Sequence, residues 1–294
     1  MLLQIIESAF IKLTLFWLFF VFTPTSGYPS AAATDNRVNP NINHEEQIRL
    51  TDVSNQVNDG SNVTWLTTET TNETNERFLA LYRADQSGLR YGSVLILHDR
   101  GQHLNWPGLL QALRTELPQE GWATLSVALP DFQENPDNTE EPDNRKTYFA
   151  ISEARLKSAI DFWQSVEQGP ALVITFGLSA HTWFAAVQNG LTPPSVLGHL
   201  LVDGYQLLPA TEFNLTEVVL GQTTPTMEWI KNTANNISQG EQRHIKAQQN
   251  NHSLYQSYPL PSLDMLTQTD TDLILKKVRQ WLNQQVKPVS KTLQ

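Results

Sequence analysis

The pattern of apolar and polar positions changes near residue 77. From there on, short apolar runs predict buried strands at residues 78–82, 91–97, 122–129, 171–176, 196–202 and 225–230. Apolar residues at helical spacing, together with one polar stretch, predict helices at residues 106–117, 148–167, 182–188, 215–220, 238–257 and 273–286. Uninterrupted apolar runs are typical of parallel strands that are covered on both faces. Residues 77–286 are therefore predicted to form an α/β domain with a doubly wound, mostly parallel sheet.

The segment before this domain has a different composition. Residues 28–76 are rich in Asn, Thr, Ser, Asp and Glu, and their apolar residues show no period. Such a composition provides too little apolar surface to form a core, so it predicts a disordered polar linker. Residues 287–294 are predicted to be a short tail.

The N-terminus has the pattern of an export signal. Lys12 precedes an apolar run over residues 13–22, which is shorter than the roughly 20 residues of a membrane span. Small and turn-forming residues follow through Gly27 and residues 31–33. We expect a signal peptide over residues 1–27, cleaved there or as late as residue 33. An uncleaved N-terminal membrane anchor is the alternative.

Composition excludes several classes of function. The 294 residues carry a formal net charge of −10 and no cysteine. Disulfides, thiol catalysis and cysteine metal sites are therefore excluded. No basic cluster is present, so nucleic acid is not an expected partner. No metal-ligand spacing and no nucleotide-binding glycine motif occurs, so we predict neither a metal nor a cofactor.

The stretch around Ser179 carries the most specific candidate chemistry. Residues 171–176 predict a strand, residues 177–181 a sharp turn, and the residues after them a helix. A serine at the apex of such a turn is the geometry of a nucleophile elbow, whose usual sequence is G-x-S-x-G. Gly177 and Ser179 match this motif, but His181 replaces its last glycine. Ser179 is thus either an exposed nucleophile or a residue that caps the turn and the helix.

Other candidate residues follow the predicted strands. The carboxyl ends of parallel strands share one rim of the sheet, and ligands bind along that rim. The candidate oxyanion donors are the N–H of Ala180 and the loop from His98 to Gly101. Alternatively, His98 caps its strand and Gly101 supplies a turn. Three further residues on the rim are candidates for ligand binding: Arg100, His103 and His181.

A catalytic serine also requires an acid and a histidine later in the chain. Asp203 directly follows a predicted strand and is the candidate acid. Glu228 lies within a predicted strand and is expected to be structural or exposed. His252 is the candidate base, with His244 as the alternative, although neither lies in the turn that usually presents a catalytic histidine.

Two stretches carry a family resemblance. Residues 92–103, GSVLILHDRGQH, form a strand that ends in a His-x-x-Gly turn, and Trp106-Pro107 follows; residues 121–130, GWATLSVALP, form a Gly-Trp strand that ends in Leu-Pro. These features resemble DUF3530, an uncharacterised bacterial family of exported α/β-hydrolase-like proteins. The resemblance covers roughly residues 77 to 286. It implies a sheet of α/β-hydrolase type and a place in a Gram-negative cell envelope, whereas the activity of the family is not established.

Two hypotheses for the function follow. The first is a degenerate hydrolase in the periplasm, which keeps the fold and binds a small-molecule ester or an envelope component. The second is an esterase-like serine hydrolase, in which Ser179 attacks and Asp203 and His252 activate it. In both, no part of the chain spans the membrane once the signal is cleaved.

Overall fold

The computed structural model describes residues 40–68, 76–131, 141–167, 169–231, 237–260 and 266–285. All of them belong to one structural unit that begins at Pro40. The predicted signal peptide and the predicted tail lie outside the described residues. No helix within these ranges is both long and apolar enough to cross a membrane.

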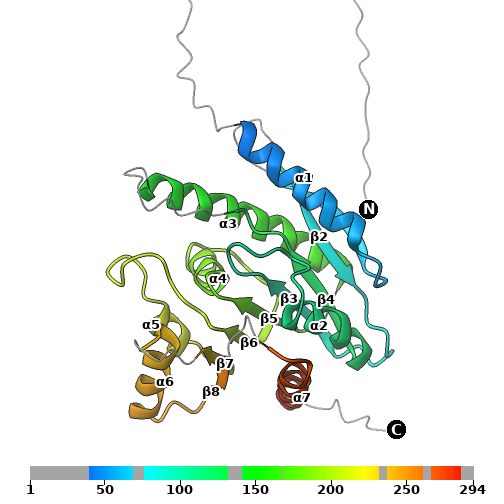
Figure 1. The fold of residues 1–294 in the computed structure, drawn as a ribbon. Coiled ribbons are helices and arrows are strands. Elements are labelled where there is room, and N and C mark those ends of the chain that lie inside the picture. The colour runs from blue at the N-terminus through cyan, green and yellow to red at the C-terminus, as the bar shows by residue number, and fades with distance from the viewer. Residues whose placement is uncertain are drawn as a thin grey trace, which may run out of the picture. The chain divides into compact units, whose positions relative to one another are not determined.

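Eight strands form one sheet in the described part of the chain, in the order β1-β2-β4-β3-β5-β6-β7-β8 (Figure 1). Their bounds are β1 (Asn62–Thr67), β2 (Arg77–Arg83), β3 (Gly92–Leu97), β4 (Trp122–Val127), β5 (Ala171–Phe176), β6 (Val196–Val202), β7 (Thr226–Lys231) and β8 (Tyr255–Leu260). β2 pairs antiparallel with both β1 and β4, and all other pairs are parallel. Every residue of β3, β4 and β5 is buried, which explains their uninterrupted apolar sequences. The predicted mostly parallel sheet is thus confirmed.

Helices cover both faces of the sheet. On one face, an apolar core joins the strands to α3 (Glu141–Val166), α4 (Ser179–Gln188), α5 (Leu215–Leu220) and α6 (Gln239–Gln249). On the other face, a second core joins them to α2 (Leu109–Glu116) and α7 (Gln268–Gln285). A 3-10 helix, η1 (Leu117–Glu120), continues α2. This layering is the doubly wound arrangement that the sequence predicts.

The N-terminal part of the unit differs from the predicted linker. α1 (Pro40–Gln56) and β1 lie within residues 28–76, and Figure 1 shows α1 beside β2. Leu50 and Val53 of α1 are buried against Leu79 and Leu81 of β2. The linker prediction is therefore wrong for residues 40–68. The prediction rested on the low apolar content of this segment, which does not reveal that Leu50 and Val53 lie on one helix face and pack on β2.

A buried ion pair fastens α1 to the domain. The guanidinium of Arg155, on α3, is fully buried and donates to both carboxylate oxygens of Glu46 at 2.8 and 2.9 Å. It also donates to Glu76 Oε1 at 2.6 Å and to the carbonyl oxygen of Ala128 at 3.2 Å. These partners come from α1, the start of β2 and the end of β4. Arg155 therefore joins segments that lie far apart in the sequence.

The polar stretch 238–257 also departs from its prediction as one helix. α6 begins with a capping box, in which the side chains of Ser238 and Glu241 accept from each other's backbone N–H groups. The helix ends at Gln249. Asn251 then takes a positive φ of 49°, and β8 begins at Tyr255. The sequence YQSYPL lacks a continuous apolar run because β8 is the edge strand of the sheet and is exposed on one side.

Candidate functional site

The residue at the apex of the turn after β5 is Gly177. β5 ends at Phe176 and α4 begins at Ser179, so the turn between them consists of Gly177 and Leu178 alone. Gly177 has a φ of +53°, a conformation that costs any residue with a Cβ atom. A nucleophile elbow places its nucleophile at this strained residue, directly after the strand. The expectation that Ser179 is at the apex is wrong by two positions.

A carboxylate fills the space beside the apex. A Cβ atom built on Gly177 would lie 2.1 to 2.2 Å from the carboxylate atoms of Asp99, far inside van der Waals contact. Asp99 directly follows His98, in the loop after β3. The space that the side chain of a nucleophile would need is therefore occupied by another residue of the same chain.

The same carboxylate uses the oxyanion donors. Leu178, the residue after the apex, donates its backbone N–H to Asp99 Oδ1 at 2.8 Å. Arg100 donates its backbone N–H to the same oxygen at 2.8 Å, and the Tyr205 hydroxyl donates to it at 3.2 Å. In an elbow, the oxyanion is held by the N–H after the nucleophile and by an N–H of the loop after β3. Here both donors already hold Asp99.

Burial and hydrogen bonding act in opposite directions on Asp99. Burial raises the pKa of the carboxyl, and the N–H groups of Leu178 and Arg100 and the hydroxyl of Tyr205 oppose this, with the net pKa above its ordinary value. The same neighbourhood raises the pKa of Tyr205, first by burial and then by the charge of Asp99. Three donors on one oxygen indicate that the site holds a carboxylate in the folded protein.

Ser179 lies in the interior with no exposed surface. Its hydroxyl oxygen accepts from the N–H of Phe176 at 2.9 Å, and its proton is shared between the carbonyl oxygens of Leu97 and Phe176, both at 2.9 Å. It thereby joins the ends of β3 and β5. Among the described residues, no histidine nitrogen forms a hydrogen bond with this hydroxyl.

The other predicted oxyanion residues have structural partners. The N–H of Ala180 points back to the carbonyl of Gly177 at 3.3 Å, as the first turn of α4. His98 is buried, and its Nε2 accepts from the N–H of Leu129 at 2.9 Å while its Nδ1 donates to the carbonyl of Asp99 at 2.7 Å. Gly101 has a φ of +72° and open space around it, as in the alternative interpretation of a turn glycine.

The predicted acid and the predicted base lie at opposite ends of the parallel strands. Asp203 follows β6, at the carboxyl ends of the strands, and its carboxylate accepts from the N–H of Lys231 at 3.4 Å. Burial raises its pKa. His252 precedes β8, at the amino ends of the parallel strands, and its Nε2 bonds the carbonyl of Leu220 at 2.6 Å. The structure therefore does not bring Ser179, Asp203 and His252 together.

Glu228 and His244, the other two residues considered as acid or base, form hydrogen bonds within the fold. Glu228 of β7 is fully buried, forms an ion pair with Arg243 and accepts from the Tyr255 hydroxyl at 2.5 Å, as expected for a structural residue. His244 of α6 bonds the Ser257 hydroxyl at 2.6 Å.

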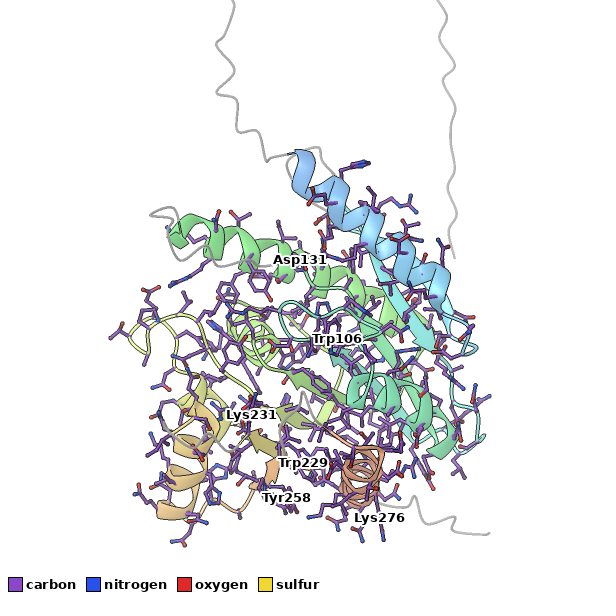
Figure 2. All side chains as sticks on the ribbon, viewed as in Figure 1. Trp106, Asp131, Trp229, Lys231, Tyr258 and Lys276 are labelled. Atoms are coloured by element: carbon purple, nitrogen blue, oxygen red, sulfur yellow. The ribbon has the colours of Figure 1, made fainter. Side chains whose placement is uncertain are left out.

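Figure 2 labels two aromatic residues of the last strands. Trp229 of β7 and Tyr258 of β8 lie with their ring centroids 5.2 Å apart. The ammonium of Lys277 lies over the Tyr258 ring at 4.2 Å, a cation–π contact. No histidine occurs in the sequence after His252. The chain therefore lacks an imidazole at the end of its last strand, where the histidine of a hydrolase triad is expected.

The remaining predicted rim residues have different surroundings. His103 accepts from the N–H of Asn105 and contacts Trp106 edge-on at a centroid distance of 5.2 Å. Arg100 takes part in the Asp99 site through its backbone. His181 lies on α4 and lines a cavity of about 550 Å³ beside the elbow. Within the described ranges, no three His, Asp or Glu side chains converge as a metal site.

Comparison with known proteins gives the family. The chain matches the family described as "Protein of unknown function (DUF3530)" over residues 17–150 and 133–284, and it therefore belongs to this family. No curated protein matches it.

Solved structures give the fold. A cold-adapted esterase from an Arctic intertidal metagenomic library superposes with a TM-score of 0.56 at 13% identity, over 77% of this chain and 94% of its own. An esterase of Pyrococcus furiosus gives 0.53 at 12%, over 77% and 92%. A dienelactone hydrolase of Anabaena variabilis gives 0.52 at 14%, over 77% and 99%. The chain therefore has the α/β-hydrolase fold, as predicted.

Sequence reasoning missed Asp99 and Tyr205. Asp99 stands in the loop that was expected to hold an oxyanion, and an acidic residue there, directly after His98, was the available signal. Tyr205 gives no such signal, because its hydroxyl reaches Asp99 only through the fold.

Proposed function

We propose that this protein is a binding protein that has kept the α/β-hydrolase fold and lost its hydrolytic chemistry. One observation carries the proposal: the Asp99 carboxylate occupies the place of both the nucleophile and the oxyanion, opposite Gly177. A glycine has no side chain that can attack a carbonyl. The N–H groups of Leu178 and Arg100 both donate to Asp99, so neither is available to a developing oxyanion.

The alternative, a serine hydrolase that uses Ser179, lacks support from the geometry. Its hydroxyl is buried and already engaged on three sides by Phe176 and Leu97. An active serine also needs a histidine within hydrogen-bond reach, and Ser179 has none among the described residues.

The test is covalent labelling of the purified domain. We expect no reaction with a fluorophosphonate and no release of p-nitrophenol from short p-nitrophenyl esters above the buffer rate. The expectation also covers Asp99→Ala, which frees the two backbone donors but supplies no nucleophile. Labelling of the wild type that disappears in a folded Ser179→Ala variant would overturn the proposal and support the hydrolase.

We further propose that the protein is exported to the periplasm, where its ligand is a small molecule or an envelope component. The support is the apolar run of residues 13–22 followed by small residues. Expression in a Gram-negative host should give a soluble periplasmic chain that begins between residues 28 and 34, as read by mass spectrometry of its N-terminus. A full-length chain in the membrane fraction would instead indicate an uncleaved anchor.

A further inference from the structure

The two end strands of the sheet differ in whether they can accept a further strand. In β8, the carbonyl of Leu254 bonds β7, so the alternation of backbone groups turns Pro259 toward the outer edge, where it has no N–H to donate. At the other end of the sheet, β1 has the sequence NVTWLT, with no proline, no charged residue and no irregularity in its pairing with β2. Natural proteins usually protect their edge strands, so an unprotected edge such as β1 indicates a partner.

The hydrogen bonds of β1 show which of its residues face the open edge. Thr68, directly after the strand, donates its N–H to the carbonyl of Glu76 at 2.9 Å, so the backbone of Thr68 faces β2. Backbone groups alternate between the two sides of a strand, so Val63, Trp65 and Thr67 turn their N–H and C=O groups away from β2. β1 has no second neighbour among the described strands, and Val63 is 39% exposed. Each of the three residues therefore offers one donor and one acceptor at an accessible edge.

The three outward residues are complementary to the same residues of a second copy. In an antiparallel pair centred on Trp65, the two Trp65 residues lie opposite each other, and Val63 of each copy lies opposite Thr67 of the other. The two residues of each pair exchange both N–H···O bonds, so every outward group of these residues has a partner. Aromatic pairs and pairs of β-branched side chains are favourable at such positions. Although the chain has a net charge of −10, β1 has no charged residue, so no like charges meet along the paired strands.

We propose that the protein forms a homodimer by antiparallel pairing of two β1 strands, which joins the two sheets into one. A second copy fits this edge better than an unrelated peptide, because its β1 is already held as a strand by β2 and loses little conformational entropy on pairing. β1 runs in the same direction as β4, so the carboxyl-end rims of the two copies point in opposite directions. The proposal goes beyond the proposed function and does not depend on it.

The experiment tests the register in which positions 63 and 67 of different copies meet. Both positions are exposed, so charged side chains there are compatible with folding. The variant V63K/T67E places opposite charges across the dimer axis, whereas V63K/T67K places like charges there. Each variant is the matched control of the other, because both change the same two positions. In sedimentation equilibrium of the purified exported chain, we expect the wild type and V63K/T67E to be dimers. V63K/T67K should dissociate with a Kd at least about tenfold higher than that of V63K/T67E.

Chemical cross-linking provides an independent test of the register. The chain contains no cysteine, so one introduced cysteine reports on a single position. In a mixture of Val63→Cys and Thr67→Cys chains, a short bismaleimide should join one variant to the other. Chains of either variant alone should link far less, because like positions lie roughly 14 Å apart along the paired strands.

Three results would overturn the proposal. The first is a wild type that stays a monomer at roughly 100 μM, which excludes a dimer of useful affinity. The second is an equal Kd for V63K/T67E and V63K/T67K, which would place the contact elsewhere on the molecule. The third is cross-linking that does not depend on mixing the two cysteine variants. None of these measurements involves ester hydrolysis, so labelling of Ser179 would overturn the proposed function and leave the dimer unaffected.

Discussion

Gly177 and Asp99 depend on each other at the end of β5. The glycine makes room for the carboxylate, and the carboxylate accepts from the N–H of Leu178 in the turn and from the N–H of Arg100 in the loop after β3. Sequence alone aligned Gly177 with the first glycine of the G-x-S-x-G motif, which put Ser179 at the apex. The true register depends on where β5 ends and on Asp99, which lies in the distant loop after β3. No local pattern contains that information.

We predict that Gly177→Ala is far more destabilising than Gly101→Ala. Both glycines have a positive φ, +53° and +72°, so both substitutions should cost about 1 to 2 kcal/mol of backbone strain. Gly101 has nothing within 4 Å of a Cβ atom, whereas at Gly177 the Asp99 carboxylate must move and lose its donors. We expect roughly 3 kcal/mol or more in total for Gly177→Ala, measured by urea unfolding.

A double substitution checks the cause. Asp99→Ala with Gly177→Ala should cost at least about 1 kcal/mol less than the sum of the two single substitutions, because the clash then disappears. Equal costs for Gly177→Ala and Gly101→Ala, or additive effects in the double variant, would contradict this account.

At the scale of elements, the apolar runs predicted the central strands correctly, whereas the predictions for the polar segments that form α1 and β8 were wrong. β3, β4 and β5 are buried on both faces, so nearly every residue in them is apolar or small and the run is visible in the sequence. α1 and β8 bury only part of their surface, and their stability comes from partners elsewhere in the chain. For α1 the main partner is Arg155, whose ion pair with Glu46 spans 109 positions.

We predict that Arg155→Met detaches or strongly destabilises α1. It leaves Glu46, which is only 5% exposed, as an unpaired buried charge, and breaking such a pair costs about 3 to 5 kcal/mol. The control is Arg49→Met, on α1 itself, whose ion pair with Asp131 is partly exposed and should contribute less than about 1 kcal/mol. Urea unfolding and limited proteolysis near residues 40–56 measure both. Similar losses in the two variants would show that burial of the pair is unimportant.

At the scale of the whole molecule, three buried histidines link stability to pH. Burial lowers the pKa of His98, His181 and His199 to about 4 each. In the unfolded chain they take up protons near pH 6.5, so between pH 6.5 and 4 the unfolded state binds more protons than the folded state. Their contribution to stability is therefore present above pH 6.5 and is lost as the pH falls toward 4.

We predict that the free energy of unfolding falls by about 1 kcal/mol per pH unit for each of these histidines as the pH drops from 6 to 5. Carboxylates add to the total slope, so the test is a difference: His181→Phe should be less steep than the wild type by about that amount. Above pH 7.5 the two curves should run parallel, since none of the three groups titrates there. Identical slopes between pH 5 and 6 would contradict the prediction for His181.

The carboxylate beside Gly177 also limits which substitutions could give this chain hydrolytic activity. Hydrolysis by an elbow at this place would need a nucleophile at position 177, removal of Asp99 and a histidine after β8, where residues 253–294 contain none. A side chain at position 177 alone collides with Asp99, and loss of Asp99 alone leaves the N–H groups of Leu178 and Arg100 unpaired. Each of these two substitutions alone lowers the stability of the fold and supplies no hydrolytic activity. Neither substitution alone therefore builds a hydrolase site at this turn, and both positions would have to change together.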